Sequence, residues 1–247
     1  MNNKIIVGVL PQVTTKNDNI FYNDRNEFVD MYSKKIKECG AETIGLLIND
    51  EKIDESVLTL CDAFWIPGGT AIHDAYYDVI NYAIKNNKPL LGICLGMQAL
   101  SIYSVFVDDP DSYNKIAFKE KYNKYKEEHN GFVLAKIEPT TVIHNTYINN
   151  DTIKTSFHPV HITDNESHLY SMYQKEVIDE ASLHQYTPFT IGDSFKITAK
   201  AEDDVIEAIE YKDSNYFIVG VQFHPENDEV NIIFKRLVEE GLKRQNK

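Results

Sequence analysis

PLLGICLGMQ (residues 89–98) joins a short apolar run to a helical segment through a cysteine that lies between two glycines. The apolar run, 89–94, is typical of a strand buried on both faces of a parallel sheet. The residues from 95 to 103 predict a helix that begins directly after Cys94. A sharp strand-to-helix turn can hold a nucleophile in a strained conformation, and a helix N-terminus favours a thiolate. Cys94 is therefore a candidate nucleophile, although the motif alone is equally compatible with a buried structural cysteine.

Strand and helix patterns alternate on the N-terminal side of this turn. Apolar runs predict buried strands at 4–10, 41–48 and 63–67, and helical spacing predicts helices at 26–39, 54–60 and 74–87. This β-α-β order implies a parallel sheet with right-handed crossovers. We therefore predict an α/β fold with a doubly wound, mostly parallel sheet and helices on both faces.

The C-terminal side of the turn has a different character. Residues 104–150 are rich in Tyr, Lys, Asp and Asn and indicate an excursion from the sheet, with a helix near 113–129 and a strand at 132–137. Four later segments predict an antiparallel extension, followed by a final helix at about 229–242; these strands are 158–163, 195–202, 205–211 and 216–223. The chain contains no repeat and no low-complexity linker, so residues 1–247 are expected to form a single domain with this excursion.

Composition restricts the class of partner. The chain of 247 residues carries 25 Lys and Arg against 38 Asp and Glu, a net charge of −13, which repels phosphate backbones and anionic lipids. No segment approaches the roughly 20 apolar residues of a transmembrane helix, and the N-terminus shows no secretory signal. Three scattered cysteines indicate no disulfide framework and favour a reducing compartment. We predict a cytoplasmic protein without a nucleic-acid or membrane partner.

Two further motifs end predicted strands. VGVQFHPE (219–226) places His224 at a strand end, with Glu226 two residues later. A cysteine nucleophile needs a base and a partner that orients the base, and His224 and Glu226 can fill these two roles. WIPGG (65–69) places the amides of Gly68 and Gly69 at a strand end, where one of them and the amide of Leu95 could form an oxyanion hole. Each motif alone has an ordinary explanation, a surface His and Glu in the first case and a simple turn in the second.

Taken together, PGG, GICLGMQ and VGVQFHPE resemble, in this order, the class I glutamine amidotransferase superfamily over nearly the whole chain. The resemblance implies a flavodoxin-like fold and a cysteine that forms a γ-glutamyl thioester. It also assigns Cys94 as nucleophile, His224 as base and Glu226 as partner of the histidine. Gln98 matches a position that helps to bind the glutamyl group.

Segments outside these motifs resemble one branch of the superfamily, the γ-glutamyl hydrolases and γ-glutamyl-aminobutyrate hydrolases of peptidase C26. They are HPVHI (158–162), SLHQY (182–186) and DDVIEAIEY (203–211), and they match His184 to a position near the substrate. Two features depart from this branch. The segment from Gly69 to Cys94 is shorter and is closer to that of synthetase glutaminase components, and Leu95 stands where an arginine is common.

Three functions remain compatible with the resemblance. The first is a free-standing hydrolase acting on a small γ-glutamyl substrate. The second is a glutaminase subunit that takes glutamine and delivers ammonia to a synthase partner. The third is a noncatalytic binding relative, against which the intact set of three candidate residues argues.

No cofactor or metal is expected. His158 and His161 should face opposite sides of one strand. No ligand-type cluster is expected among His73, His129, His144 and His168. The helix at 113–129 follows the nucleophile helix, so we predict that it lies over or beside the Cys94 pocket and restricts the leaving amine. The alternative is that it packs on the far flank and contributes only to stability.

Overall fold

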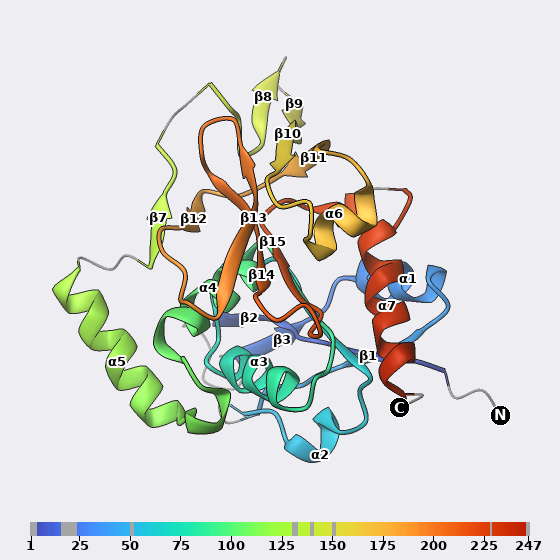
Figure 1. Ribbon diagram of the computed structural model, residues 1–247, viewed down its shortest axis with the longest axis vertical. Coiled ribbons are helices and arrows are strands. Elements are labelled where there is room, and N and C mark those ends of the chain that lie inside the picture. Colours follow the sequence, from blue (N-terminus) through green and yellow to red (C-terminus); the bar gives the residue numbers. More distant parts are fainter. Residues whose placement is uncertain are drawn as a thin grey trace.

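A nine-stranded sheet runs through the molecule in the order β11-β10-β13-β14-β15-β6-β5-β1-β4 (Figure 1). The computed structural model describes residues 4–15, 24–49, 52–129, 133–138, 141–149, 152–227 and 229–245. Five neighbouring strands are parallel: β4 (Glu42–Gly45), β1 (Ile6–Val9), β5 (Ala63–Ile66), β6 (Leu90–Ile93) and β15 (Ile218–Val221). Numbered along the chain, their spatial order is 2-1-3-4-5, the flavodoxin-like order. The predicted fold class is confirmed.

The sheet continues beyond β15 as an antiparallel extension. Its strands are β14 (Ile206–Tyr211), β13 (Phe195–Ala201), β10 (Ser156–Ile162) and β11 (Val177–Ser182). β15 joins the two parts, because it pairs in parallel with β6 and antiparallel with β14. The four segments predicted for this extension are all strands of the sheet, with 216–223 as β15, and β11 is an additional strand of the same sheet.

Helices cover both faces of the parallel strands. Buried side chains of β5 point alternately to the two faces of the sheet. On one face Trp65 packs with α1 (Asp30–Glu38) and α7 (Ile232–Gln245). On the other face Phe64 packs with α3 (Ala75–Lys85) and α4 (Leu95–Phe106). The short helices α2 (Glu55–Leu58) and α6 (His168–Tyr173) add to the two cores. No helix among the described residues has the length and apolar character needed to cross a membrane.

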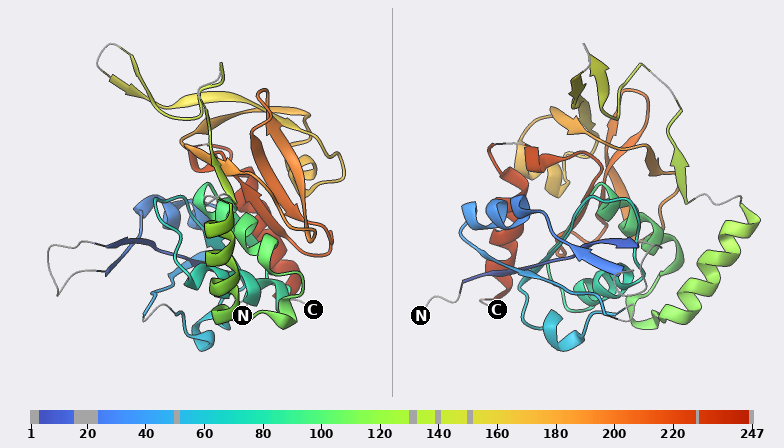
Figure 2. Two further views of the ribbon diagram at one scale, coloured as in Figure 1. Left: turned by 90° about the vertical axis from the view of Figure 1, so that its left-hand side faces the viewer. Right: turned by 180° about the vertical axis from the view of Figure 1, so that it is seen from behind.

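Short hairpins extend from this body (Figure 2). β2 (Gln12–Thr15) pairs with β3 (Asp24–Glu27), and β8 (Tyr147–Asn149) pairs with β9 (Thr152–Lys154). A third pair joins β7 (Leu134–Lys136) to β12 (Tyr186–Pro188), and two 3-10 turns occur at Pro110–Ser112 and Pro225–Asn227. The helix predicted at 26–39 begins only at Asp30, because the preceding residues form β3.

The excursion places α5 (Lys115–Glu128) against α3 and α4. Phe118 is its buried anchor, with ring centroids 4.4 Å from Tyr77 and 5.8 Å from Phe106. Ile116 on the same helix is 71% exposed. Lys115 forms an ion pair of 2.8 Å with Asp78 of α3.

Candidate active site

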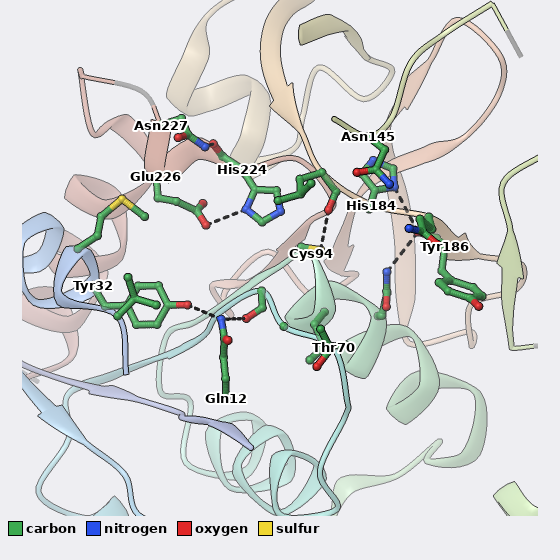
Figure 3. Close-up of a pocket in the computed structure, with 18 residues that line it drawn as sticks. Gln12, Tyr32, Thr70, Cys94, Asn145, His184, Tyr186, His224, Glu226 and Asn227 are labelled. Carbon is green, nitrogen blue, oxygen red and sulfur yellow. Dashed lines mark hydrogen bonds and ion pairs between the residues drawn. The ribbon is translucent and has the colours of Figure 1, made fainter. Parts of the chain in front are cut away.

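Cys94 lies at the junction of β6 and α4, at the carboxyl edge of the parallel strands (Figure 3). Its φ of 50° and ψ of −103° are a strained conformation for a residue with a side chain. Two backbone hydrogen bonds hold Cys94 in place. The Cys94 amide donates to the Val221 carbonyl at 2.7 Å, and the Cys94 carbonyl accepts from the Gln98 amide at 3.1 Å. A Cβ on Gly96 would lie 2.2 Å from the Ile66 carbonyl oxygen. The second glycine of the motif is therefore required for α4 to pack against β5.

His224 and Glu226 meet beside this cysteine. His224 Nδ1 lies 2.8 Å from Glu226 Oε1, and both side chains are largely buried. Burial lowers the pKa of His224, but hydrogen bonding to Cys94 and Glu226 outweighs burial and raises this pKa to about 10. The other ring nitrogen, Nε2, is buried without a well-aligned partner among the described residues, and the ring lies beside Cys94 (Figure 3). The structure therefore brings the three predicted residues together.

The Gly68–Gly69 loop closes against this group. A Cβ on Gly68 would lie 2.9 Å from His224 Cε1 and 3.5 Å from Cys94 Cβ, so only glycine leaves room for the imidazole. Gln12 Nε2 donates to the Gly68 carbonyl at 2.8 Å and to the Tyr32 hydroxyl at 3.0 Å. The chain contains no cis peptide among the described residues, so the Gly69 amide points away from this carbonyl.

Two backbone amides at the site are available as donors. Within the described part of the chain, neither the Leu95 amide nor the Gly69 amide donates to another protein group. Leu95 opens α4, where the first amides of a helix have no partner inside the helix. The amides of Leu95, Gly69 and Gly68 are the oxyanion-hole donors predicted from the sequence.

A pocket of about 610 Å³ opens above the cysteine. Its walls come from the loop after β5, the start of α4, the loop between β11 and β12, and residues near β2 and α1. The loop between β11 and β12 approaches the sulfur, since Cys94 Sγ donates to the Leu183 carbonyl at 3.8 Å. The polar lining residues are Gln12, Tyr32, Thr70, Gln98, Asn145, His184, Gln185, Tyr186, His224, Glu226 and Asn227 (Figure 3).

The two predicted substrate-binding residues both line this pocket and also have protein partners. Gln98 Nε2 donates to the Tyr186 carbonyl at 3.2 Å and to Gln222 Oε1 at 3.3 Å. His184 Nδ1 lies 3.2 Å from the Tyr186 carbonyl oxygen, and its other nitrogen lies 3.4 Å from the buried carboxylate of Glu207. Both residues therefore support the loop that carries Tyr186, whatever contact they make with a substrate.

The prediction that the 113–129 helix lies over or beside this pocket is wrong. The described lining residues include none from α5, which packs on the flank formed by α3 and α4. Asn145 is the lining residue that the excursion supplies. The physical reason is the aromatic side of α5, whose Phe118 is buried by Tyr77 and Phe106 far from the loops at the carboxyl edge.

Sequence patterns missed several lining residues. Gln12 and Tyr32 belong to β2 and α1, and no nearby motif marks them except the Pro-Gln that ends the first apolar run. Asn145 and Asn227 lie in a loop and a short turn with no periodic signal. Their contribution depends on tertiary packing, which local sequence does not display.

Comparison with known proteins agrees with this geometry. Residues 77–226 match the peptidase C26 family. The chain is 26% identical to the glutamine amidotransferase-like protein RP404 of Rickettsia prowazekii, over 92% of each chain. It is 30% identical to CTP synthase of Thermotoga maritima over 72% of this chain, and it spans only 34% of that enzyme's length.

Solved structures share the fold at low identity. The glutaminase domain of Trypanosoma brucei CTPS, solved with bound acivicin, superposes with a TM-score of 0.67 and 18% identity, covering 97% of this chain and 94% of that one. A GMP synthase component of Thermoplasma acidophilum gives a TM-score of 0.63 at 15% identity, covering 100% and 98% of the two chains. The chain belongs to the peptidase C26 family, within the class I glutamine amidotransferase superfamily.

Proposed function

We propose that this chain is a hydrolase that cleaves the amide bond of a small γ-glutamyl compound. The main support for this proposal is the strained Cys94, which lies beside the His224–Glu226 pair at the base of an open pocket. Family membership supports amidohydrolase chemistry of the glutamine type. In this proposal Cys94 is the nucleophile, His224 transfers protons, and Glu226 orients His224.

The reaction proceeds in two halves. The Cys94 thiol first gives its proton to His224, and the resulting thiolate attacks the γ-carbonyl carbon. The C–N bond then breaks, and the departing amine takes that proton from His224. A pKa of about 10 keeps His224 protonated at neutral pH, so the ring is ready to act as this acid. His224 then takes a proton from water, whose oxygen attacks the thioester, and the C–S bond breaks to release glutamate. Glu226 accepts a hydrogen bond from Nδ1 and keeps Nε2 directed toward the sulfur.

The tetrahedral intermediates carry negative charge on the former carbonyl oxygen. The amides of Leu95 and Gly69 are assigned as its donors. Neither has an acceptor within the described part of the chain, Leu95 directly follows Cys94, and a Cβ on Gly69 would lie 3.0 Å from the Leu95 side chain. Gln12 then acts as a positioning residue, since its bond to the Gly68 carbonyl fixes the direction of the Gly69 amide.

The pocket size favours a substrate larger than glutamine. Its volume of about 610 Å³ lies within the range of roughly 300–1,000 Å³ that is usual for small-molecule sites. A γ-glutamyl group that reaches Cys94 would leave room for an organic amine between the Leu183–Tyr186 loop and Asn145.

A second candidate function is a glutaminase that supplies ammonia to a synthase partner. The likeness to a region of CTP synthases favours it, as does the short segment between Gly69 and Cys94. The match of residues 77–226 to the peptidase C26 family and the resemblance of SLHQY (182–186) to its hydrolases favour the free-standing hydrolase, which we rank first.

The test is turnover by the purified chain on glutamine and on a panel of γ-glutamyl amines. We expect release of glutamate and amine, with larger amines preferred over ammonia, and loss of turnover in Cys94→Ala. An electrophilic glutamine analogue should label Cys94, and Cys39→Ser serves as the control that leaves labelling intact. Labelling at Cys39 or Cys61 would reject the nucleophile. Turnover of glutamine alone, appearing only with an added synthase, would support the second function.

A further inference from the structure

Three histidines and one glutamate converge beneath the wall of the pocket. His144 precedes β8, His158 lies on β10, His184 follows β11, and Glu207 lies on β14. Their side chains are between 0% and 4% exposed, and one potential ligand atom from each lies within 4.8 Å of all the others. The sequence showed no sign of a ligand-type cluster at His144 or His158, but the structure brings both together with His184 and Glu207, because four distant segments supply one residue each.

The outward nitrogens of the three imidazoles already have acceptors. His144 Nε2 lies 3.0 Å from Asp203 Oδ2, His158 Nδ1 lies 3.1 Å from the Pro159 carbonyl oxygen, and His184 Nδ1 lies 3.2 Å from the Tyr186 carbonyl oxygen. A ring nitrogen next to a carbonyl or carboxylate oxygen carries the proton. Each remaining nitrogen then presents a lone pair to the centre of the cluster. This is the usual arrangement around histidines that bind metals.

The inward atoms face one another at distances longer than a good hydrogen bond. His144 Nδ1, His158 Nε2, His184 Nε2 and both oxygens of Glu207 are buried, and none has a well-aligned hydrogen-bond partner among the described residues. The three nitrogens lie 3.3, 3.6 and 3.4 Å from Glu207 Oε1. Three lone pairs and a carboxylate in a dry interior would repel one another, so positive charge at the centre, from a metal ion or from protons on the imidazoles, would stabilise the cluster.

The spacing around Glu207 Oε1 favours a metal ion over protons. A protonated imidazole would approach the carboxylate to about 2.7–2.9 Å, which is shorter than all three contacts. Ligands about 2.0–2.1 Å from a tetrahedral zinc ion lie about 3.4 Å apart along each edge. The contacts of Glu207 Oε1 agree with such an edge.

We propose that His144, His158, His184 and Glu207 bind a divalent transition-metal ion, with zinc as the best match. Three neutral imidazoles and one carboxylate are a suitable donor set for zinc. All four ligand positions come from the protein and are buried, so the ion is structural and has no open position for catalysis.

The proposed ion would hold the loop that approaches the nucleophile. Leu183, directly before His184, accepts the weak hydrogen bond from Cys94 Sγ at 3.8 Å. The His184 amide donates to the His144 carbonyl at 2.7 Å, so two ligand-bearing segments are also joined through their backbones. Both His184 and Asn145, the neighbour of His144, line the pocket (Figure 3). The ion therefore links the antiparallel extension of the sheet to the pocket wall.

The direct test is metal content and re-binding by the full chain. Protein produced with zinc and dialysed extensively should retain one zinc ion per chain. Strong chelation should remove the ion and lower the unfolding temperature, and added zinc should restore it. Cobalt(II) added to the chelated protein should give the intense visible absorption of a tetrahedral site.

Variants locate the ion. His158→Gln and Glu207→Gln should lose the retained zinc and the cobalt absorption, whereas His161→Gln should keep both. His161 is a matched control because it lies on the same strand, with its side chain 44% exposed and outside the cluster. If a ligand variant does not fold, titration of the chelated wild-type protein still decides the question. Absence of retained zinc, of a zinc-dependent rise in unfolding temperature and of the cobalt signal would overturn the proposal, as would retention of zinc in folded ligand variants. None of these readouts depends on the hydrolase activity.

Discussion

Replacing Gln12 tests how the oxyanion hole is built. Its amide makes two hydrogen bonds, 2.8 Å to the Gly68 carbonyl and 3.0 Å to the Tyr32 hydroxyl. Gln12→Ala removes both, which allows the Gly68–Gly69 peptide to rotate and to turn the Gly69 amide away from Cys94. Gln12→Glu has nearly the same size, cannot donate when ionised, and places negative charge near the Gly68 carbonyl.

The size of the effect follows from these bonds. A net hydrogen bond contributes about 0.5–1.5 kcal/mol, so releasing the Gly68 carbonyl should lower kcat up to about tenfold in Gln12→Ala. Complete loss of one oxyanion donor costs about 10²–10³ in kcat, and Gln12→Glu should approach the lower end of that range. KM should change little, since the donor acts mainly in the transition state.

Steady-state kinetics on the preferred γ-glutamyl amide, with thermal unfolding in parallel, measure this prediction. Tyr32→Phe is the control, because it removes the other partner of the same amide and leaves the bond to Gly68; it should cost much less in kcat. Wild-type kcat in a folded Gln12→Glu variant would refute the positioning role. A rise in KM without a fall in kcat would instead assign Gln12 to substrate binding.

Other perturbations address the histidine, the glycine loop and the excursion. Gly68→Ala should lower kcat by at least about tenfold, because the new methyl carbon would lie 2.9 Å from His224 Cε1; an unchanged rate would show that the ring can move freely. The pKa of His224 is about 10 in the folded chain and about 6.5 in the unfolded chain. Protonation of His224 therefore stabilises the fold by at most about 5 kcal/mol. This contribution is complete below pH 6.5 and is lost as the pH rises to 10. Urea unfolding of the wild type and of His224→Gln across this range should show a difference that shrinks with pH, and a constant difference would contradict the raised pKa. Phe118→Ala should cost about 3–5 kcal/mol of stability without altering the range of accepted amides, and a broader range in the folded variant would restore a selector role for α5.

Local sequence was sufficient for the fold, and strand-end motifs together with the family resemblance identified the three candidate catalytic residues. Buried parallel strands are continuous apolar runs, so the segments around Val7, Phe64 and Leu91 could be recognised without knowledge of their neighbours. Cys94 and His224 each end such a strand, and strand ends of a parallel sheet meet at one edge. Their proximity was therefore predictable from order and type of element alone.

Tertiary structure alone determined the supporting residues. Gln12 reaches Gly68 only because the chain turns into β2 after β1. The helix α5 packs against α3 and α4 because Phe118 contacts Tyr77 and Phe106 there. Neither contact has a periodic or motif signal in the sequence.

The histidine cluster shows the same division most clearly. His144, His158, His184 and Glu207 are separated by 14 or more positions along the chain and lie on four different segments. Each residue taken singly resembles an ordinary polar position, and the sequence determines only that His158 and His161 face opposite sides of a strand. Their convergence depends on the antiparallel pairing of β10 with β13 and of β13 with β14, and on the loops that fold back over these strands. These long-range contacts form only when the sheet is complete, so the candidate metal site is a property of the tertiary fold.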